Sequence, residues 1–364
     1  MTQQIDRKTI ESLIQARDVS DLLLHDLVEL FREEDMIKHI PENMFKIDPR
    51  NGVRILYHAS RSARPHDTKA STTRLKVEED MCVICEGKTT GVVDVAELSE
   101  GFTFINKNLY PILYPFKNLQ PGDNQSAFGL HFLQWTSSIH DKDWHNMAPQ
   151  DCLVVIRRLA ILEGKLISGS SQLFRDRASP PEGHAIIVKN YGNRVGASLS
   201  HGHQQITFSN VKPRYYQDHV RFEVEHGEPF SAYLLRVIPS ELKVKDYGEA
   251  ILLVPPFMRR PYDMMLALKD TSKKYLHELT NAELRAVAEG WHDAARCIHR
   301  VMREMNKEIA FNITTINGPG AGLYFEFLPF TQPMGGFEHL GLYICQETPE
   351  RAADRLRRLF VEDK

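Results

Sequence analysis

The stretch "SLSHGHQQITF", residues 198–208, places two histidines and a glutamine at alternate positions. Successive side chains of a β-strand point to opposite faces, so His201, His203 and Gln205 would share one face of a strand, whereas a helix would scatter them. Histidines in a strand serve as ordinary hydrogen-bonded residues, as metal ligands or as catalytic groups. The alternation therefore predicts a strand and leaves these three uses open.

The chemistry available to such a group is attack on phosphorus. A neutral imidazole is a competent nucleophile toward phosphorus, and it leaves readily once it is protonated. The ring needs one nitrogen held by an acceptor, which fixes the tautomer. A neighbouring amide, such as that of Gln205, can hold a phosphate oxygen while charge develops on it.

The composition of the chain excludes several classes of protein. Its 364 residues are 42% hydrophobic and 26% charged, as expected for a globular protein with one large domain or two ordinary ones. A net charge of −3 argues against a broad basic face for nucleic acid. The sequence has neither an apolar run of about 18 residues nor an apolar leader, which predicts no membrane span and a cytoplasmic location.

Hydrophobic periodicity predicts an α+β protein with two related halves and a helical extension in front. The expected ranges are 1–45 for the extension, 46–212 for the first half and 213–364 for the second. We expect helices at residues 6–16, 19–40, 148–169, 281–306 and 348–360. We expect strands at residues 53–60, 101–114, 128–138, 183–190, 201–210, 249–256, 310–318, 323–330 and 341–346.

The pair Cys82 and Cys85 is the one close pair among five cysteines, which do not form a disulfide framework by count or spacing. A C-x-x-C loop lets two thiolates reach one tetrahedral ion, and zinc and redox chemistry are the two alternatives. A complete zinc site needs two more ligands. Histidines are the candidates, because the other three cysteines fall within expected helices or a strand.

Several stretches resemble, in order, those of the galactose-1-phosphate uridylyltransferase family of the histidine-triad superfamily. "GASLSHGHQQI" (196–206) resembles the H-x-H-x-Q motif of that family. The other similar stretches are "DPRNGVRILYHASRSARPHD" (48–67), "CVIC" (82–85), "FINKNLYPIL" (104–113), "GLHFLQWTSSIHDKDW" (129–144) and "LPFTQPMGGFEHLGLYICQETPERAADRLR" (328–357). The resemblance covers roughly residues 48–361, and the ordered series is more specific than any one motif.

The resemblance implies that both halves are histidine-triad-like, each an antiparallel sheet with packed helices. It also implies a role for each matching position. His203 would be the nucleophile, with Gln205 beside it. The implied ligands of one structural zinc are Cys82, Cys85, His140 and His201, with His145 as an outside alternative to His140. The implied substrate contacts are Arg61, Arg64, Asn106 and Lys107 around the nucleotide, Asn190, Gly196, Ala197 and Ser198 near the phosphates, and Glu326 in the C-terminal half.

The implied reaction is double displacement between a nucleotide sugar or related donor and a phosphate acceptor. A uridylyltransferase that uses UDP-glucose and a hexose 1-phosphate is the first expectation. A phosphorylase of ADP-glucose or of a dinucleoside polyphosphate is the alternative, and a non-catalytic, zinc-stabilised nucleotide-binding protein is a third possibility. The analogy also implies a homodimer.

The chain departs from the family pattern in two places. Gly202 replaces the proline that usually separates the two histidines. Gly322, Tyr324 and Glu326 stand where many members have histidines, and residues 224–235 lack a cysteine pair. We therefore expect no second metal site.

Overall fold

A computed structural model of the protein describes residues 4–5, 18–58, 61–62, 64, 82–116, 126–170 and 183–362. The chain divides into two compact units. The first contains residues 1–142, 157–187 and 198–218, and the second contains residues 143–156, 188–197 and 219–364. The domain boundaries expected after residues 45 and 212 stay predictions, and the helix expected at residues 6–16 lies outside the described residues.

The first unit contains antiparallel strands in the order β3-β4-β5-β7. Its strands are β3 (Val92–Glu97), β4 (Phe102–Lys107), β5 (Gly129–Trp135) and β7 (His203–Ser209). A separate hairpin joins β1 (Met44–Ile47) and β2 (Arg54–Tyr57). Strand β6 (His184–Tyr191) and helix α3 (Pro149–Ser168) each have residues in both units. The strands expected at residues 101–114, 128–138 and 201–210 are confirmed, with shorter bounds.

The prediction of a single helix at residues 19–40 is wrong. The segment forms four short pieces, which are η2 (Val19–Asp21), α2 (Leu24–Glu29), η3 (Leu30–Arg32) and η4 (Glu34–His39). Leu23 and Glu33 are extended, with ψ of 160° and 149°. The backbone N–H of Leu23 donates to the Asp26 carboxylate instead of continuing a helix. Side chains that cap the backbone locally compete with helix propagation, and here they interrupt an otherwise helical pattern.

A buried ion pair fixes the start of this segment within the first unit. Asp94 on β3 is fully buried and accepts hydrogen bonds from the backbone N–H of Val19 at 3.1 Å and from Nε of Arg158 at 2.7 Å. Arg158 on α3 also pairs with Asp18, whose side chain is 46% exposed. The Arg158 guanidinium, with hydrogen bonds from Ser20, lowers the pKa of Asp18 to about 2 despite partial burial.

We expect Asp94→Asn to destabilise the protein by about 3 kcal/mol, because it leaves part of a buried ion pair uncompensated. Asp18→Asn is the matched control. It removes an exposed partner of the same arginine and should cost less than about 1 kcal/mol. Urea unfolding followed by circular dichroism measures both, and equal losses for the two variants would contradict this account of the pair.

The second unit contains antiparallel strands in the order β11-β12-β10-β9-β8. Its strands are β8 (Lys243–Asp246), β9 (Ala250–Leu253), β10 (Met264–Leu268), β11 (Phe311–Ile316) and β12 (Tyr324–Pro329). The helices are α6 (Phe230–Val237), α7 (Asn281–Glu304), α8 (Gly336–His339) and α9 (Pro349–Glu362), and α5 (Arg214–His226) spans the boundary. Antiparallel sheets with packed helices confirm the α+β expectation.

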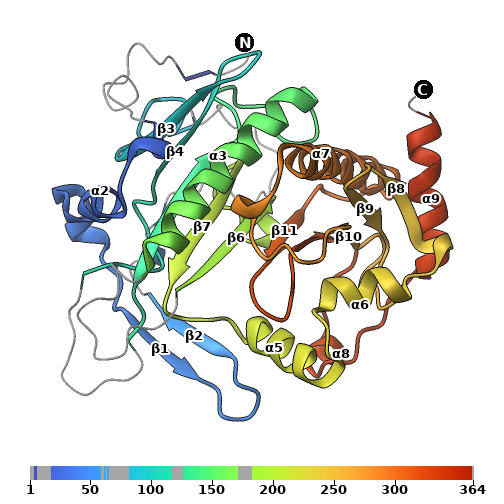
Figure 1. Ribbon diagram of the computed structural model, residues 1–364. Coiled ribbons are helices and arrows are strands. Elements are labelled where there is room, and N and C mark those ends of the chain that lie inside the picture. Colours follow the sequence, from blue (N-terminus) through green and yellow to red (C-terminus); the bar gives the residue numbers. More distant parts are fainter. Residues whose placement is uncertain are drawn as a thin grey trace. The chain divides into compact units, whose positions relative to one another are not determined.

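Helix α7 contributes many buried residues to the core of the second unit. Thr280 and Glu283 form a capping box at its start, and the helix packs on β9, β10 and β12 (Figure 1). The fully buried Trp291 contacts Trp144, Phe325 and Phe327, with ring centroids 4.9, 5.5 and 6.1 Å apart. This aromatic cluster holds the helix on the sheet.

The C-terminal stretch contains one correct and one wrong prediction. Thr348 accepts a hydrogen bond from the backbone N–H of Arg351 and caps α9, and Pro349 is the first helical residue, as predicted. The prediction of a strand at residues 341–346 is wrong. Gly341 has φ of +87° and the N–H of Leu342 bonds back to the carbonyl of Phe337, so the chain turns there.

In the described part of the chain, no helix is both long and apolar enough to cross a membrane.

Candidate active site and metal centre

Strand β7 begins at His203, so only part of the alternating motif lies in the sheet. His203 pairs with Trp135 of β5, and Gln205 pairs with Leu133. His201 precedes the strand, so the alternation of strand side chains does not set its direction. The two histidines that the spacing treats as equivalent therefore have different backbone settings, and their side chains have different partners.

His201 belongs to a compact cluster with Cys82, Cys85 and His140, whose ligand atoms all lie within 4.8 Å of one another. Sγ of Cys85 lies 3.4 Å from Nδ1 of His201 and 3.5 Å from Nδ1 of His140. Sγ of Cys82 lies 3.8 Å from Nδ1 of His201. Tetrahedral zinc would separate its sulfur and nitrogen ligands by about 3.6 Å. The cluster thus has the atoms and spacing to hold a metal ion.

The outer nitrogen of each histidine in the cluster has its own hydrogen-bond partner. Nε2 of His201 donates to the carbonyl of Ser137 at 2.7 Å, and Nε2 of His140 lies 3.1 Å from Oγ of Ser200. Because Nε2 of His201 is the donor to that carbonyl, the lone pair of the neutral His201 ring is on Nδ1, toward the thiols. Such partners orient metal-binding histidines. His145, the alternative ligand, is not in the cluster and stacks on His299.

The pKa values of the two thiols are shifted in opposite directions. Burial raises the pKa of each, but hydrogen bonds from His140 and His201 outweigh it at Cys82 and lower its pKa to about 6. Burial and the neighbouring Cys82 thiolate raise the pKa of Cys85 to about 12. A cation between the sulfurs would remove this repulsion and favour two thiolates.

His203 is held in one tautomer. The ring is 7% exposed, and its Nδ1–H donates to the carbonyl of His201 at 2.9 Å. The lone pair of the neutral ring is therefore on Nε2. The ring also packs on the buried indole of Trp135, at 4.8 Å between centroids. The residue that closes the metal cluster thus also positions His203 through its backbone carbonyl.

Gln205 is oriented by a histidine that the sequence pattern does not single out. Nδ1 of His131, on β5, accepts a hydrogen bond from the backbone N–H of Ile112 at 3.1 Å. The proton of the neutral His131 ring is therefore on Nε2. That N–H donates to Oε1 of Gln205 at 3.0 Å, which leaves the amide NH2 of Gln205 as a donor. Burial, with Arg61 adding to it, lowers the pKa of His131 to about 3 and keeps the ring neutral. His131 on β5 is paired with Thr207 on β7, and Gln205 lies two residues from Thr207 on the same face of β7. This diagonal position brings the two side chains into contact.

We expect His131→Phe to lower kcat by roughly tenfold and KM by less, because Gln205 loses its fixed orientation while its amide remains. Gln205→Ala alone should lower kcat further. In the double variant the loss should equal that of Gln205→Ala, since the two residues act as a unit. Steady-state kinetics of the four proteins gives the coupling, and additive losses would contradict this role for His131.

Arg61, Arg64 and Ser198 are predicted substrate contacts that lie in the first unit. Arg61 is half-buried, donates from Nη1 to the carbonyl of Tyr110 at 2.8 Å, and has a pKa that burial lowers to about 10. Arg64 follows one turn later and adds to this shift. Ser198, in the turn before β7, is half-buried. Their roles toward a nucleotide stay predictions.

Asn106 and Lys107 have extensive internal bonding. The amide oxygen of Asn106 accepts Nε1–H of Trp135 at 2.8 Å, and its nitrogen donates to the Lys107 carbonyl at 2.9 Å. Nζ of the fully buried Lys107 bonds the Leu30 carbonyl at 3.1 Å, Asp35 at 2.7 Å and also Glu33.

The other predicted contacts belong to the second unit. Asn190 accepts a hydrogen bond from Asn312 at 2.7 Å. Gly196 has φ of +94°, a conformation that favours glycine, and Ala197 next to it is buried. Glu326 on β12 accepts from Oγ1 of Thr314 at 3.2 Å.

Comparison with known proteins gives the relatives of this chain. No family model matches it. ADP-glucose phosphorylase of Arabidopsis thaliana is 23% identical over 341 residues, which cover 86% of this chain and 92% of that protein. A uridylyltransferase structure matches with a TM-score of 0.66 and 17% identity over 88% of this chain and 99% of the other. The structure of an A. thaliana ADP-glucose phosphorylase with bound ADP-glucose matches with a TM-score of 0.62 and 17% identity over 86% of this chain and 98% of the other. In sequence this protein is therefore similar to an ADP-glucose phosphorylase, and it shares its fold with that protein and with a uridylyltransferase.

Proposed function

We propose that the protein is an enzyme, a nucleotidyltransferase that works by double displacement through His203. The single observation that carries this proposal is the fixed tautomer of His203, whose Nδ1–H bonds the His201 carbonyl and whose lone pair is therefore on Nε2. A nitrogen nucleophile needs this arrangement. The amide NH2 of Gln205, with its oxygen held by His131, is suited to bind a phosphate oxygen.

The reaction has two steps at one phosphorus. In the first, Nε2 of His203 bonds to the α-phosphorus of the donor, and the bond from that phosphorus to the bridging oxygen breaks. The leaving group departs with the electron pair, for example as glucose 1-phosphate. In the second, an acceptor phosphate oxygen attacks the same phosphorus, the P–N bond breaks, and neutral imidazole is restored. One nucleophile thus serves both half-reactions.

For the metal we propose zinc, held by Cys82, Cys85, His140 and His201. The fit rests on the sulfur–nitrogen spacings, the soft thiolate ligands and the bonded outer nitrogens of both histidines. Four protein ligands make a closed site, so zinc would tie the loop at residues 82–87 to the segment before β7 and take no part in the reaction. Its effect on activity would come through the His201 carbonyl.

The substrate contacts that we propose follow from the chemistry of each group. Arg61 and Arg64 suit phosphate oxygens of the nucleotide. For Asn106 and Lys107 we propose indirect roles, through Trp135 and through residues 30–35, because their polar atoms already bond within the protein. The proposed phosphate-side residues are Asn190, Gly196, Ala197 and Ser198, and Glu326 is proposed at the sugar end.

For the substrates we propose ADP-glucose and orthophosphate, which would give ADP and glucose 1-phosphate. The sequence match to ADP-glucose phosphorylase over most of both chains supports this choice. The second candidate is transfer of UMP from UDP-glucose to a hexose 1-phosphate, which the fold match to a uridylyltransferase supports. A homodimer and a cytoplasmic location complete the proposal by analogy alone.

An acceptor screen tests the proposed function. The full chain is incubated with ADP-glucose, UDP-glucose or a dinucleoside tetraphosphate, each with orthophosphate or galactose 1-phosphate, and nucleotide products are separated by chromatography. We expect ADP from ADP-glucose only when orthophosphate is present. Transfer from UDP-glucose to galactose 1-phosphate without orthophosphate would favour the second candidate. No product from any combination would contradict the enzyme and leave a nucleotide-binding protein.

A further inference from the structure

The indole of Trp135 is the aromatic surface against which the ring of His203 packs. Trp135 is the last residue of β5 and pairs directly with His203, the first residue of β7. Residues that are opposite each other on adjacent strands point to the same face of the sheet, so these two side chains are neighbours. Their ring centroids are 4.8 Å apart, with an angle of 41° between the planes. The imidazole therefore contacts the indole as well as the carbonyl of His201.

The surroundings of Trp135 hold its indole in one orientation. The side chain is fully buried, and its Nε1–H donates to Oδ1 of Asn106 at 2.8 Å. The amide NH2 of Asn106 donates to the carbonyls of Lys107 at 2.9 Å and Thr90 at 3.3 Å, which leaves its oxygen as the acceptor for the indole. Phe104 stacks on the indole, with centroids 6.0 Å apart. Hydrogen bonding at one edge and stacking on the ring thus fix the aromatic surface that His203 meets.

The first step of the proposed reaction places a positive charge on the ring of His203. Nε2 bonds to the α-phosphorus while Nδ1 keeps its proton, so the ring is an imidazolium until the acceptor displaces it. The hydrogen bond from Nδ1 goes to a backbone carbonyl, which is a dipole and carries no full negative charge. An aromatic face attracts a cation within about 6 Å of its centroid, and tryptophan is the best natural side chain for this interaction. The indole of Trp135 lies within this distance of the ring that becomes charged.

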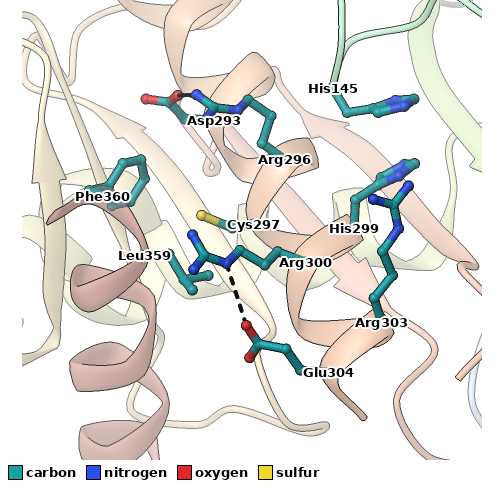
Figure 2. Close-up of a pocket in the computed structure, with 10 residues that line it drawn as sticks. All are labelled: His145, Asp293, Arg296, Cys297, His299, Arg300, Arg303, Glu304, Leu359 and Phe360. Carbon is teal, nitrogen blue, oxygen red and sulfur yellow. Dashed lines mark ion pairs between the residues drawn. The ribbon is translucent and has the colours of Figure 1, made fainter. Parts of the chain in front are cut away.

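The stacked rings of His145 and His299 show a different setting for a buried histidine. In the second unit these two rings lie one above the other, with centroids 3.6 Å apart and an angle of 14° between the planes (Figure 2). Burial, followed by the neighbouring His145 and Arg303, lowers the pKa of His299 to about 3. A ring in this setting opposes the positive charge that a bond to phosphorus would bring. The group against the face of His299 is a second imidazole, whereas the group against His203 is an electron-rich indole.

We propose that Trp135 is a positioning residue for nucleotidyl transfer, whose indole orients the His203 ring and stabilises the positive charge of the nucleotidyl-imidazolium intermediate. The inference rests on the proposed function. The positive charge is full in the intermediate and partial in the transition state on either side of it. Stabilisation by the indole would therefore speed formation of the intermediate and slow its transfer to the acceptor. These opposite effects distinguish a charge interaction from packing alone.

Fluorinated tryptophans test this interaction, because ring fluorines weaken the negative potential of the indole face and change its size little. Tryptophans with one to four ring fluorines are incorporated at position 135 of the full chain by nonsense-codon suppression. Rapid quench with the active donor and no acceptor gives the rate of leaving-group release. Addition of acceptor in a second mixing step gives the rate of transfer from the adduct. We expect formation to slow by about tenfold across the series and transfer to become faster.

Trp291 is the matched control for this series. It is fully buried and packs on Trp144 in the second unit, so the same fluorinated residues at position 291 should leave both rates unchanged. Each protein should keep its metal and its thermal midpoint. Rates that do not depend on the number of fluorines at position 135, or formation and transfer that slow together, would overturn this role of Trp135 and leave the transferase in place. No leaving-group release from the unmodified protein with any donor would instead contradict the proposed function, and this inference with it.

Discussion

Replacing His203 with alanine is expected to reduce nucleotidyl transfer by about four orders of magnitude or more, because the variant cannot form the covalent intermediate. The remaining groups that we propose to bind phosphate, including Gln205, offer no nucleophile. The loss should appear in kcat for the donor and acceptor pair that is active in the screen. Single-turnover measurements should show no release of the leaving group in the absence of acceptor.

The matched control for this variant is His25→Ala, which removes a histidine whose side chain is 75% exposed. It should retain full activity. His203→Ala should keep its bound metal and its thermal midpoint, since the ring is not among the four clustered ligands. A rate within tenfold of the unmodified protein would contradict the assignment of the nucleophile.

Replacing Cys85 with serine is expected to remove the metal and to destabilise the first unit. Sγ of Cys85 lies 3.4 and 3.5 Å from Nδ1 of His201 and His140, so its loss breaks the closed site. Structural zinc contributes on the order of 10 kcal/mol in small domains, so a fall of the thermal midpoint by about 10 °C or more is expected. Metal analysis by mass spectrometry and calorimetric melting measure the two effects.

Cys345→Ser is the control for metal content. Cys345 is a partly buried free cysteine outside the cluster, so this variant should keep one metal ion per chain. Activity of Cys85→Ser should fall together with the metal, because the His201 carbonyl that holds His203 would lose its anchor. One full equivalent of metal in Cys85→Ser would contradict the site.

The spacing of residues in the sequence does not by itself predict the ligand cluster. Cys82 and His201 are separated by more than a hundred residues, and no local pattern brings them together. The resemblance supplied that link, and the four predicted ligands do form one cluster. Alternation in residues 201–205 predicted the strand but not its start at His203, because strand bounds depend on pairing with β5.

The sequence pattern did not predict contacts between residues that are far apart in the chain, nor the helix breaks that local side-chain caps cause. It did not single out His131, because the contact of this residue with Gln205 exists only after β5 and β7 pair. It also did not predict α6 or the breaks at Leu23 and Glu33. These features follow from tertiary contacts and capping that hydrophobic periodicity does not contain.

The most direct test of the central claim is detection of a nucleotide bound to His203. The full chain is mixed with the active donor without acceptor, quenched, digested and analysed by peptide mass spectrometry. We predict an acid-labile adduct of one nucleoside monophosphate on the peptide containing His203, which disappears when acceptor is added before the quench. Product formation without such an adduct, or with the adduct on another residue, would contradict the account.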